Sequence, residues 1–140
     1  MDAAVSSPAR ADVERLPEAV CWALLESTDV ARLAVREDDG VDVLPITYAV
    51  DGRRIVFRST VGAMLRDLTI TPSVTLEIDG WTSHDAWSVV VRGLAATVHP
   101  RDVGPLERLG LTPWSAERPS QWVVIEPDVV SGRRFPRPPR

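Results

Sequence analysis

The residues VDVLPITYAVDGRRIVFRS, Val41–Ser59, carry the clearest local pattern in the chain. Strand-forming runs lie on both sides of Asp51-Gly52, and this dipeptide between two such runs is the strongest short-range signal for a β-hairpin. The first predicted strand contains Pro45, which has no N–H to donate. We therefore expect Pro45 at a sheet edge, at a bulge or at a place where the backbone faces a ligand.

Further strand-like segments lie on both sides of this hairpin. VARLAVR precedes it, and SVTLEID, AWSVVVRGLAATVH, QWVVIEP and VVSGRRF follow it. Gly93, within the longest of these segments, predicts a bulge or a bend. Six or seven strands without a βαβ rhythm predict a mainly β protein of the α+β class, a small and mostly antiparallel barrel with peripheral helices.

Three segments have helical features. Apolar residues recur at helical spacing over residues 12–27, and shorter helices are predicted over 62–68 and 102–109, the last ended by Gly110. Residues 1–11 are small, polar and interrupted by proline, so we expect them to be disordered. The basic, proline-rich residues 136–140 are expected to form a solvated tail, which leaves one domain over residues 12–135.

The composition excludes several classes of function. A formal charge of −4 disfavours general binding to nucleic acid, and no apolar run is long enough to span a membrane. The N-terminus lacks the apolar region of a secretory signal, so a cytoplasmic location is expected. The single cysteine, Cys21, lies among apolar helical positions, and neither histidine has metal-ligand spacing, so no metal site is predicted.

The segment FRSTVGAML, Phe57–Leu65, joins a predicted strand to a predicted helix. Arg58, the hydroxyls of Ser59 and Thr60, and the N–H groups at the start of the helix could together bind a phosphate group. The alternative is a structural loop in which Thr60 caps the helix and Arg58 points into solvent. The residues alone leave both interpretations open.

The order of these segments resembles the pyridoxamine 5′-phosphate oxidase-like, FMN-binding split-barrel family, in its short actinobacterial-type branch, over nearly all of residues 18–135. The matching pieces are RLAV, PITYAVDG, IVFRSTVGAML, LEIDG, WSVVVRGLA, LTPW, QWVVI and SGRRF. The resemblance implies a six-stranded antiparallel split β-barrel. It also implies a homodimer that holds FMN, or in some branches F420 or haem, in a groove between subunits.

The resemblance also assigns roles to residues. It implies ring contacts for Pro45, Ile46, Thr47 and Tyr48, phosphate contacts for Arg58, Ser59, Thr60 and Gly62, and groove walls at Met64, Leu65, Trp87, Ser88 and Trp122. Relatives commonly carry lysine where this chain has Met64 and arginine where it has Val124. Methionine keeps an apolar stem but carries no charge, so two expected cations are missing from this chain.

The resemblance implies a flavin-dependent oxidoreductase that transfers electrons or hydride between FMN and a small molecule. The alternative from another class is a cofactor-free homodimeric barrel with a binding or structural role, which the residues Met64 and Val124 favour. The same groove could instead hold F420 or haem, because one architecture supports several chemistries.

Overall fold

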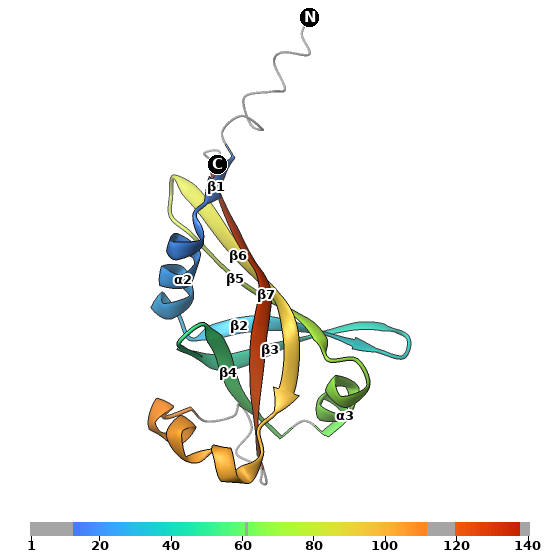
Figure 1. Cartoon of the computed structure of the whole chain (residues 1–140). Coiled ribbons are helices and arrows are strands. Elements are labelled where there is room, and N and C mark those ends of the chain that lie inside the picture. Colours follow the sequence, from blue (N-terminus) through green and yellow to red (C-terminus); the bar gives the residue numbers. More distant parts are fainter. Residues whose placement is uncertain (1–12, 61, 112–119, 138–140) are drawn as a thin grey trace, which may run out of the picture.

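The computed structural model describes residues 13–60, 62–111 and 120–137. Its strands form one antiparallel sheet in the order β1-β7-β4-β3-β2-β5-β6, and a further pairing of β6 with β7 closes the ring (Figure 1). The strands are β1 Glu14–Leu16, β2 Val30–Glu37, β3 Gly40–Asp51, β4 Arg54–Ser59, β5 Ser73–Trp81, β6 Asp85–Thr97 and β7 Gln121–Pro136. The predicted class, an antiparallel split β-barrel with few short helices, is confirmed.

The hairpin that the sequence predicts most strongly is present. β3 and β4 pair antiparallel from Tyr48↔Phe57 to Asp51↔Arg54, and Gly52 in the turn has a φ of 65°. This left-handed conformation is one that glycine adopts at little cost, so Asp51-Gly52 sets the register of the pair.

Gly93 also has the role that the sequence predicts. The register between β6 and β7 shifts between Arg92 and Gly93, which marks an irregularity of the β-bulge kind. A Cβ atom on Gly93 would collide with the carbonyl oxygen of Glu126 on β7. The bend in the longest strand pair of the barrel therefore depends on a residue without a side chain.

Two apolar clusters lie on opposite sides of β4 and β7. The larger cluster fills the barrel and includes Ile55, Phe57, Val123 and Ile125. The smaller cluster contains Val56, Leu106, Leu111 and Trp122 and lies beneath the 3₁₀ helices. Successive side chains of a strand point to opposite faces, so the two strands contribute to both clusters.

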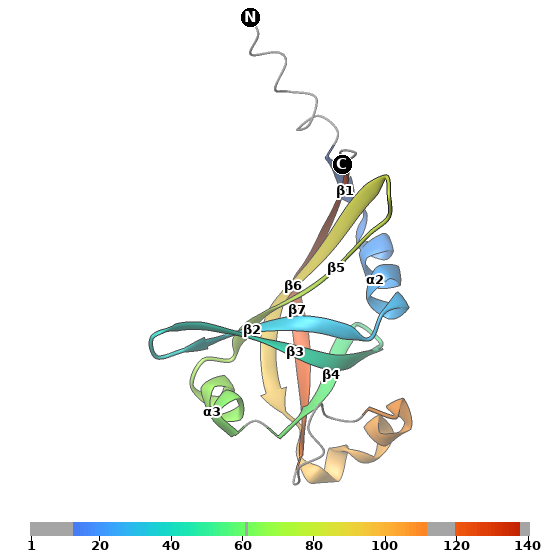
Figure 2. The same ribbon diagram turned by 180° about the vertical axis from the view of Figure 1, so that it is seen from behind.

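The helices differ in detail from the prediction. Residues 14–16, expected to be helical, form β1 and pair with the end of β7, so α2 spans only Glu18–Ser27 after the extended Pro17. α3 spans Gly62–Ile70, and the expected helix over 102–109 is a pair of 3₁₀ helices, Pro100–Asp102 and Gly104–Leu109. Figure 2 shows α2 along the outside of the barrel and α3 near the base of the β2–β3 hairpin.

The ends of the chain can be compared with the prediction only in part. The segment 1–11, expected to be disordered, lies outside the described residues, as do residues 138–140. In the expected solvated tail, Pro136 instead ends β7, and Arg137 donates hydrogen bonds to the carbonyl oxygens of His84 and Thr82 at 2.8 Å. Among the described residues, no helix is both long and apolar enough to cross a bilayer.

Candidate functional site

The segment Pro45–Thr47 of β3 has an edge that is not paired with β4, whereas Tyr48 is paired with Phe57. β3 pairs with β2 over Gly40–Thr47 but with β4 only over Tyr48–Asp51. The N–H of Tyr48 donates to the carbonyl oxygen of Asp29 at 2.9 Å, on the β2 side. Because backbone groups alternate along a strand, the N–H of Thr47 and the carbonyl of Pro45 point away from β2. Pro45 therefore lies at a sheet edge, as expected, and costs the β2–β3 pair no hydrogen bond.

The side chains of this segment divide between two faces. Ile46 and Tyr48 belong to the barrel core, and the Tyr48 hydroxyl donates to the carbonyl oxygen of Leu25 at 2.6 Å. Burial raises the pKa of Tyr48 well above its usual value. Pro45 is exposed and Thr47 half-buried on the other face. A ligand at this edge would meet the main chain and the side chains of Pro45 and Thr47, but not those of Ile46 and Tyr48.

The predicted phosphate residues do not converge as the sequence suggested. Arg58 and Ser59 are neighbours on β4, so their side chains point to opposite faces of the sheet. Arg58 donates to the carbonyl oxygen of Leu111 at 3.0 Å and to the Ser120 hydroxyl at 2.5 Å. The alternative in which Arg58 points into solvent is therefore wrong, because its side chain is tied to the segments before and after residues 112–119. The phosphate contact of Arg58 stays a prediction.

Met64 and Trp122 are also covered within the protomer. Met64 is 4% exposed and belongs to the barrel core, and Trp122 is 6% exposed in the smaller cluster. Val124 packs against that same cluster. Met64 is therefore part of the hydrophobic interior and not a groove wall, because α3 turns this position toward the sheet. Leu65, one position further on, packs against the same core.

A different cation lies near the start of α3. The Nη1 atom of Arg66 lies 4.0 Å from the position that a Cβ on Gly62 would occupy. The guanidinium therefore folds back along α3 toward its first residue. The N-terminus of a helix presents unpaired N–H groups and a partial positive charge, both of which favour an anion. Thr60 is half-buried just before this turn, and Val61, which separates it from the helix, lies outside the described residues.

Trp87 and Ser88 lie near the start of β6, where they pair with the ends of β5 and β7. The ring of Trp87 packs over Gly80 on β5, where a Cβ would lie 2.6 Å from the ring carbon Cζ2. Ser88 lines a groove of about 490 Å³ between β1, β6 and β7, together with Val13, Arg15, Leu16, Val90, Val130, Ser131, Gly132 and Arg133. The structure does not bring these two residues together with the start of α3 in one protomer.

The residues at the β3 edge and at the start of α3 fit a phosphate-bearing flavin in part. Thr60, Gly62 and Arg66 can hold a phosphate, and the β3 edge offers backbone groups to a planar ring. In the protomer, the Arg58 side chain donates to Leu111 and Ser120, and Met64 lies in the barrel core. Sequence reasoning missed Arg66 because it assigned the cation to position 64, although a residue four positions after Gly62 also lies above it on a helix.

A comparison with protein families matches the pyridoxamine 5′-phosphate oxidase model over residues 17–134. The chain belongs to this family. An uncharacterized protein of Mycobacterium tuberculosis is 34% identical over 96 residues, which cover 65% of this chain and 86% of that protein. A solved structure, the FAD binding protein from Mycobacterium smegmatis, is 32% identical with a TM-score of 0.76 and covers 89% of this chain and 100% of that one.

A third relative matches a smaller part of this chain. An uncharacterized Rhizobium meliloti protein is 38% identical over 74 residues, or 52% of this chain, and the match spans 49% of that protein, about half its length. Within the described part of the chain, no three histidine, cysteine, aspartate or glutamate residues gather as metal ligands.

Proposed function

We propose that this member of the pyridoxamine 5′-phosphate oxidase family binds a flavin, with FMN as the leading ligand, and acts as an oxidoreductase. The observation that carries the proposal is the β3 edge at Pro45–Thr47, which β4 leaves unpaired, together with the cationic start of α3. The first could face a planar ring, and the second could hold a phosphate. The FAD binding protein from Mycobacterium smegmatis, 32% identical to this chain, supports a flavin as the ligand class.

In the proposed complex, the protein's residues bind and orient the cofactor. Thr60, Gly62 and Arg66 hold the phosphate by charge-assisted hydrogen bonds, which are stronger than those between neutral groups. The N–H of Thr47 and the carbonyl of Pro45 face the ring edge. A bound flavin supplies hydride or single-electron transfer, and the substrate is a small molecule that reaches the ring from solvent.

A homodimer completes the proposed site. Several large apolar side chains are exposed on the outer face of the sheet in one protomer: Val41, Val43, Leu94 and Val129. Large apolar side chains left exposed on a sheet are common at protein interfaces. Trp87 and Ser88, distant from α3 in their own protomer, would belong to the site through the partner subunit.

A cofactor-free barrel is the second candidate, and one observation favours it. Met64 and Val124, which stand where relatives commonly carry cations, both pack in apolar clusters. Without a cation at either position, Arg66 is the cation left to bind the phosphate in the proposed site. A hydrogen bond to a charged group contributes about 1.5 to 3 kcal/mol, so one lost contact weakens binding roughly ten- to a hundredfold.

Titration of the purified full chain with FMN, FAD, F420 and haem tests the proposal. Saturable quenching of flavin fluorescence, with a stoichiometry of one flavin per chain, supports the flavin site. A protein that stays colourless and binds none of the four ligands supports the cofactor-free barrel. Saturation by haem or F420 with no response to either flavin contradicts the leading proposal in favour of another cofactor class.

A further inference from the structure

Two carboxylates share one arginine on the outer face of β2 and β5. Arg32 pairs in register with Glu77, and Asp79 lies two residues further along the same face of β5. The Nη1 atom of Arg32 lies 3.7 Å from Glu77 and 3.6 Å from Asp79, which is too far for a hydrogen bond to either carboxylate. The Oε1 atom of Glu77 is buried and has no hydrogen-bond partner among the described residues. The guanidinium therefore balances only part of the negative charge of these three residues, which we call the Arg32 cluster.

The neighbouring strands do not supply the missing positive charge. Pro45 of β3 is the register partner of Arg32, and Val90 of β6 is the register partner of Glu77. Both of these neighbours are uncharged and mainly apolar. An apolar surrounding favours the neutral form of a carboxyl group, so the strands on both sides of the Arg32 cluster favour a proton on Glu77.

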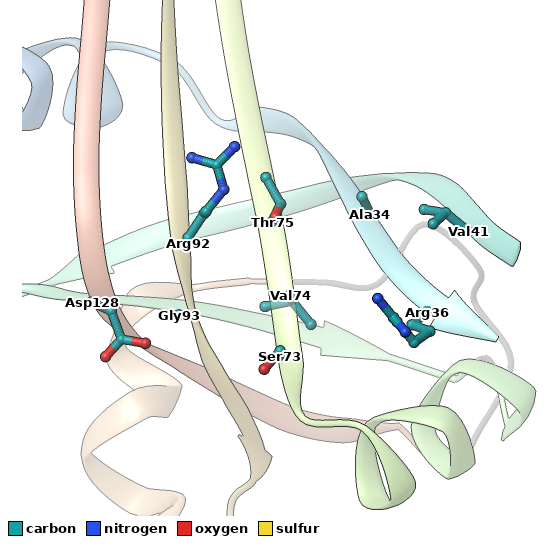
Figure 3. A pocket seen from close by; sticks show the side chains of 9 residues that line it. All are labelled: Ala34, Arg36, Val41, Ser73, Val74, Thr75, Arg92, Gly93 and Asp128. Atoms are coloured by element: carbon teal, nitrogen blue, oxygen red, sulfur yellow. The ribbon is translucent and has the colours of Figure 1, made fainter.

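The nearest further cation on this face is Arg92 of β6. It pairs in register with Thr75 and therefore lies diagonally across from Glu77. In Figure 3 the Arg92 side chain lies beside Thr75, where both residues line a hollow of about 320 Å³. No ion pair joins Arg92 to Glu77 in the part of the chain that the structure describes. The surplus negative charge of the Arg32 cluster thus stays uncompensated within one protomer.

The proposed homodimer brings a second copy of the Arg32 cluster to the first. In that dimer Ser88 of β6 joins the flavin site of the partner, whose β3 edge carries Pro45 and Thr47. β2 and β5 lie between β3 and β6 in the sheet order. A two-fold axis that brings β6 of each protomer to β3 of the other therefore passes over β2 and β5. Residues beside such an axis meet their own copies, because the same patch is used by both subunits.

We propose that the Arg32 cluster lies at the two-fold axis of the homodimer and makes dimerisation weaker as the pH rises. This inference rests on the homodimer of the proposed function. One arginine and two carboxylates per protomer give two arginines and four carboxylates at the axis. When all of them are ionised, two negative charges remain without a partner. One proton on each Glu77 removes this excess, and each Arg32 can then pair with the two Asp79 carboxylates.

The sign of the pH dependence follows from the groups around Glu77. Within one protomer, burial and the neighbouring Asp79 raise the pKa of Glu77 to about 7, and Arg32 opposes that rise. The second cluster adds negative charge and excludes water, so the pKa of Glu77 is higher in the dimer than in the monomer. The stability of the dimer is therefore fully present below about pH 7 and is lost as the pH rises through the higher pKa of the dimer.

Sedimentation velocity of the full chain without added flavin tests this inference, over a range of protein concentrations at pH 6 and pH 8. We expect the dissociation constant of the dimer to be at least about tenfold higher at pH 8, because two groups titrate in each dimer. Glu77→Gln keeps the shape of the protonated side chain and should dimerise equally well at both pH values. Glu107→Gln, at an exposed position of a 3₁₀ helix, should behave like the unmodified chain. Circular dichroism shows whether each variant is folded.

The other outcomes separate this inference from the proposed function. A dimer with the same dissociation constant at pH 6 and pH 8, or one that tightens as the pH rises, would overturn the inference and leave the homodimer intact. Full pH dependence in Glu77→Gln would also overturn it, because another group would then titrate. A chain that stays monomeric at both pH values would overturn the inference together with the homodimer, whereas the flavin titration decides separately whether a flavin binds.

Salt provides a second test of the electrostatic cause. Raising sodium chloride from about 0.05 M to about 0.5 M should reduce the difference between the two pH values, because salt screens the repulsion between the partly exposed carboxylates. A difference that is unchanged by salt would contradict repulsion at the axis.

Discussion

The guanidinium of Arg58 lies over the indole ring of Trp122, with its central carbon 5.1 Å from the ring centroid. The two residues are register partners on β4 and β7. The same guanidinium also donates to Leu111 and Ser120. Arg58 thus connects the sheet to the segments that flank residues 112–119, and its role within the protomer is structural.

Replacing Arg58 should therefore lower stability. Arg58→Met keeps much of the apolar stem but loses the cation–π contact and two hydrogen bonds, which predicts a loss of about 2 kcal/mol in the free energy of unfolding. Urea denaturation of both proteins measures the difference. The exposed Arg101→Met provides the control, and equal unfolding midpoints for the two variants would show that Arg58 is not anchored in solution.

Arg66 should contribute to flavin affinity. Its guanidinium lies near Gly62, so Arg66→Ala removes the cation proposed for the phosphate and should weaken FMN binding about tenfold, while Arg66→Lys should restore part of the loss. Fluorescence quenching of FMN measures both affinities. Riboflavin, which lacks the phosphate, should bind the Arg66→Ala variant and the unmodified chain equally. A tenfold loss for riboflavin as well would assign Arg66 to a different part of the ligand.

Met64→Lys should destabilise the fold and should not improve flavin binding. The Met64 side chain is 4% exposed in the barrel core, and an unpaired charge there costs several kcal/mol. Thermal unfolding followed by circular dichroism should show a large fall in the midpoint, whereas the volume-conserving Met64→Leu should cost less than about 1.5 kcal/mol. A stable Met64→Lys protein with tighter FMN binding would mean that this side chain can reach the phosphate.

Stability should depend on pH through Glu77. Burial, together with the hydrogen bond and charge of Asp79, raises the pKa of Glu77 to about 7, and the charge of Arg32 opposes that rise. Between about pH 4.5 and 7 the folded state therefore holds a proton that the unfolded state has released, so the free energy of unfolding falls as pH rises. Glu77→Gln should reduce this fall by about 1 kcal/mol after allowance for solvent screening.

Urea denaturation of Glu77→Gln and of the unmodified chain at pH 5 and pH 8 measures this effect. The exposed Glu107→Gln serves as the control. Parallel pH dependence in the Glu77 variant and the unmodified chain would mean that Glu77 is ionised in the folded protein over the whole range.

Gly93→Ala should be among the most damaging small substitutions in the barrel. The added methyl group would collide with the carbonyl oxygen of Glu126, which is backbone and cannot move away easily, so we expect a loss of at least about 2 kcal/mol. Gly104→Ala adds the same group where no atom lies within 4 Å. Comparing the unfolding midpoints of the two variants separates the collision from a general effect of replacing glycine, and similar midpoints would contradict the close approach.

Local signals in the sequence were enough to predict the main elements of the barrel. Asp51-Gly52 fixed the hairpin, and Gly93 marked the bulge, because both depend on backbone geometry that few other residues adopt. The face of the sheet to which the Arg58 side chain points could also be predicted, because Ile55, Phe57 and Ser59 alternate with Val56 and Arg58 along one strand. The opposite faces of Arg58 and Ser59 follow from that alternation alone.

Other features depended on contacts that no local pattern contains. The short strand β1 forms because Glu14–Leu16 meets the end of β7, more than a hundred residues away in the sequence. The core position of Met64 follows from how α3 packs on the barrel, which its sequence does not specify.

The division of β3 into inward and outward side chains has an evolutionary consequence. Tyr48 and Ile46 hold this strand from the inside, so mutations at Pro45 and Thr47 can accumulate without threatening the architecture. Proteins that share this barrel can then change the ligand that they bind through a few surface substitutions. We expect the ligand preference of such proteins to diverge faster than the identities of their core residues.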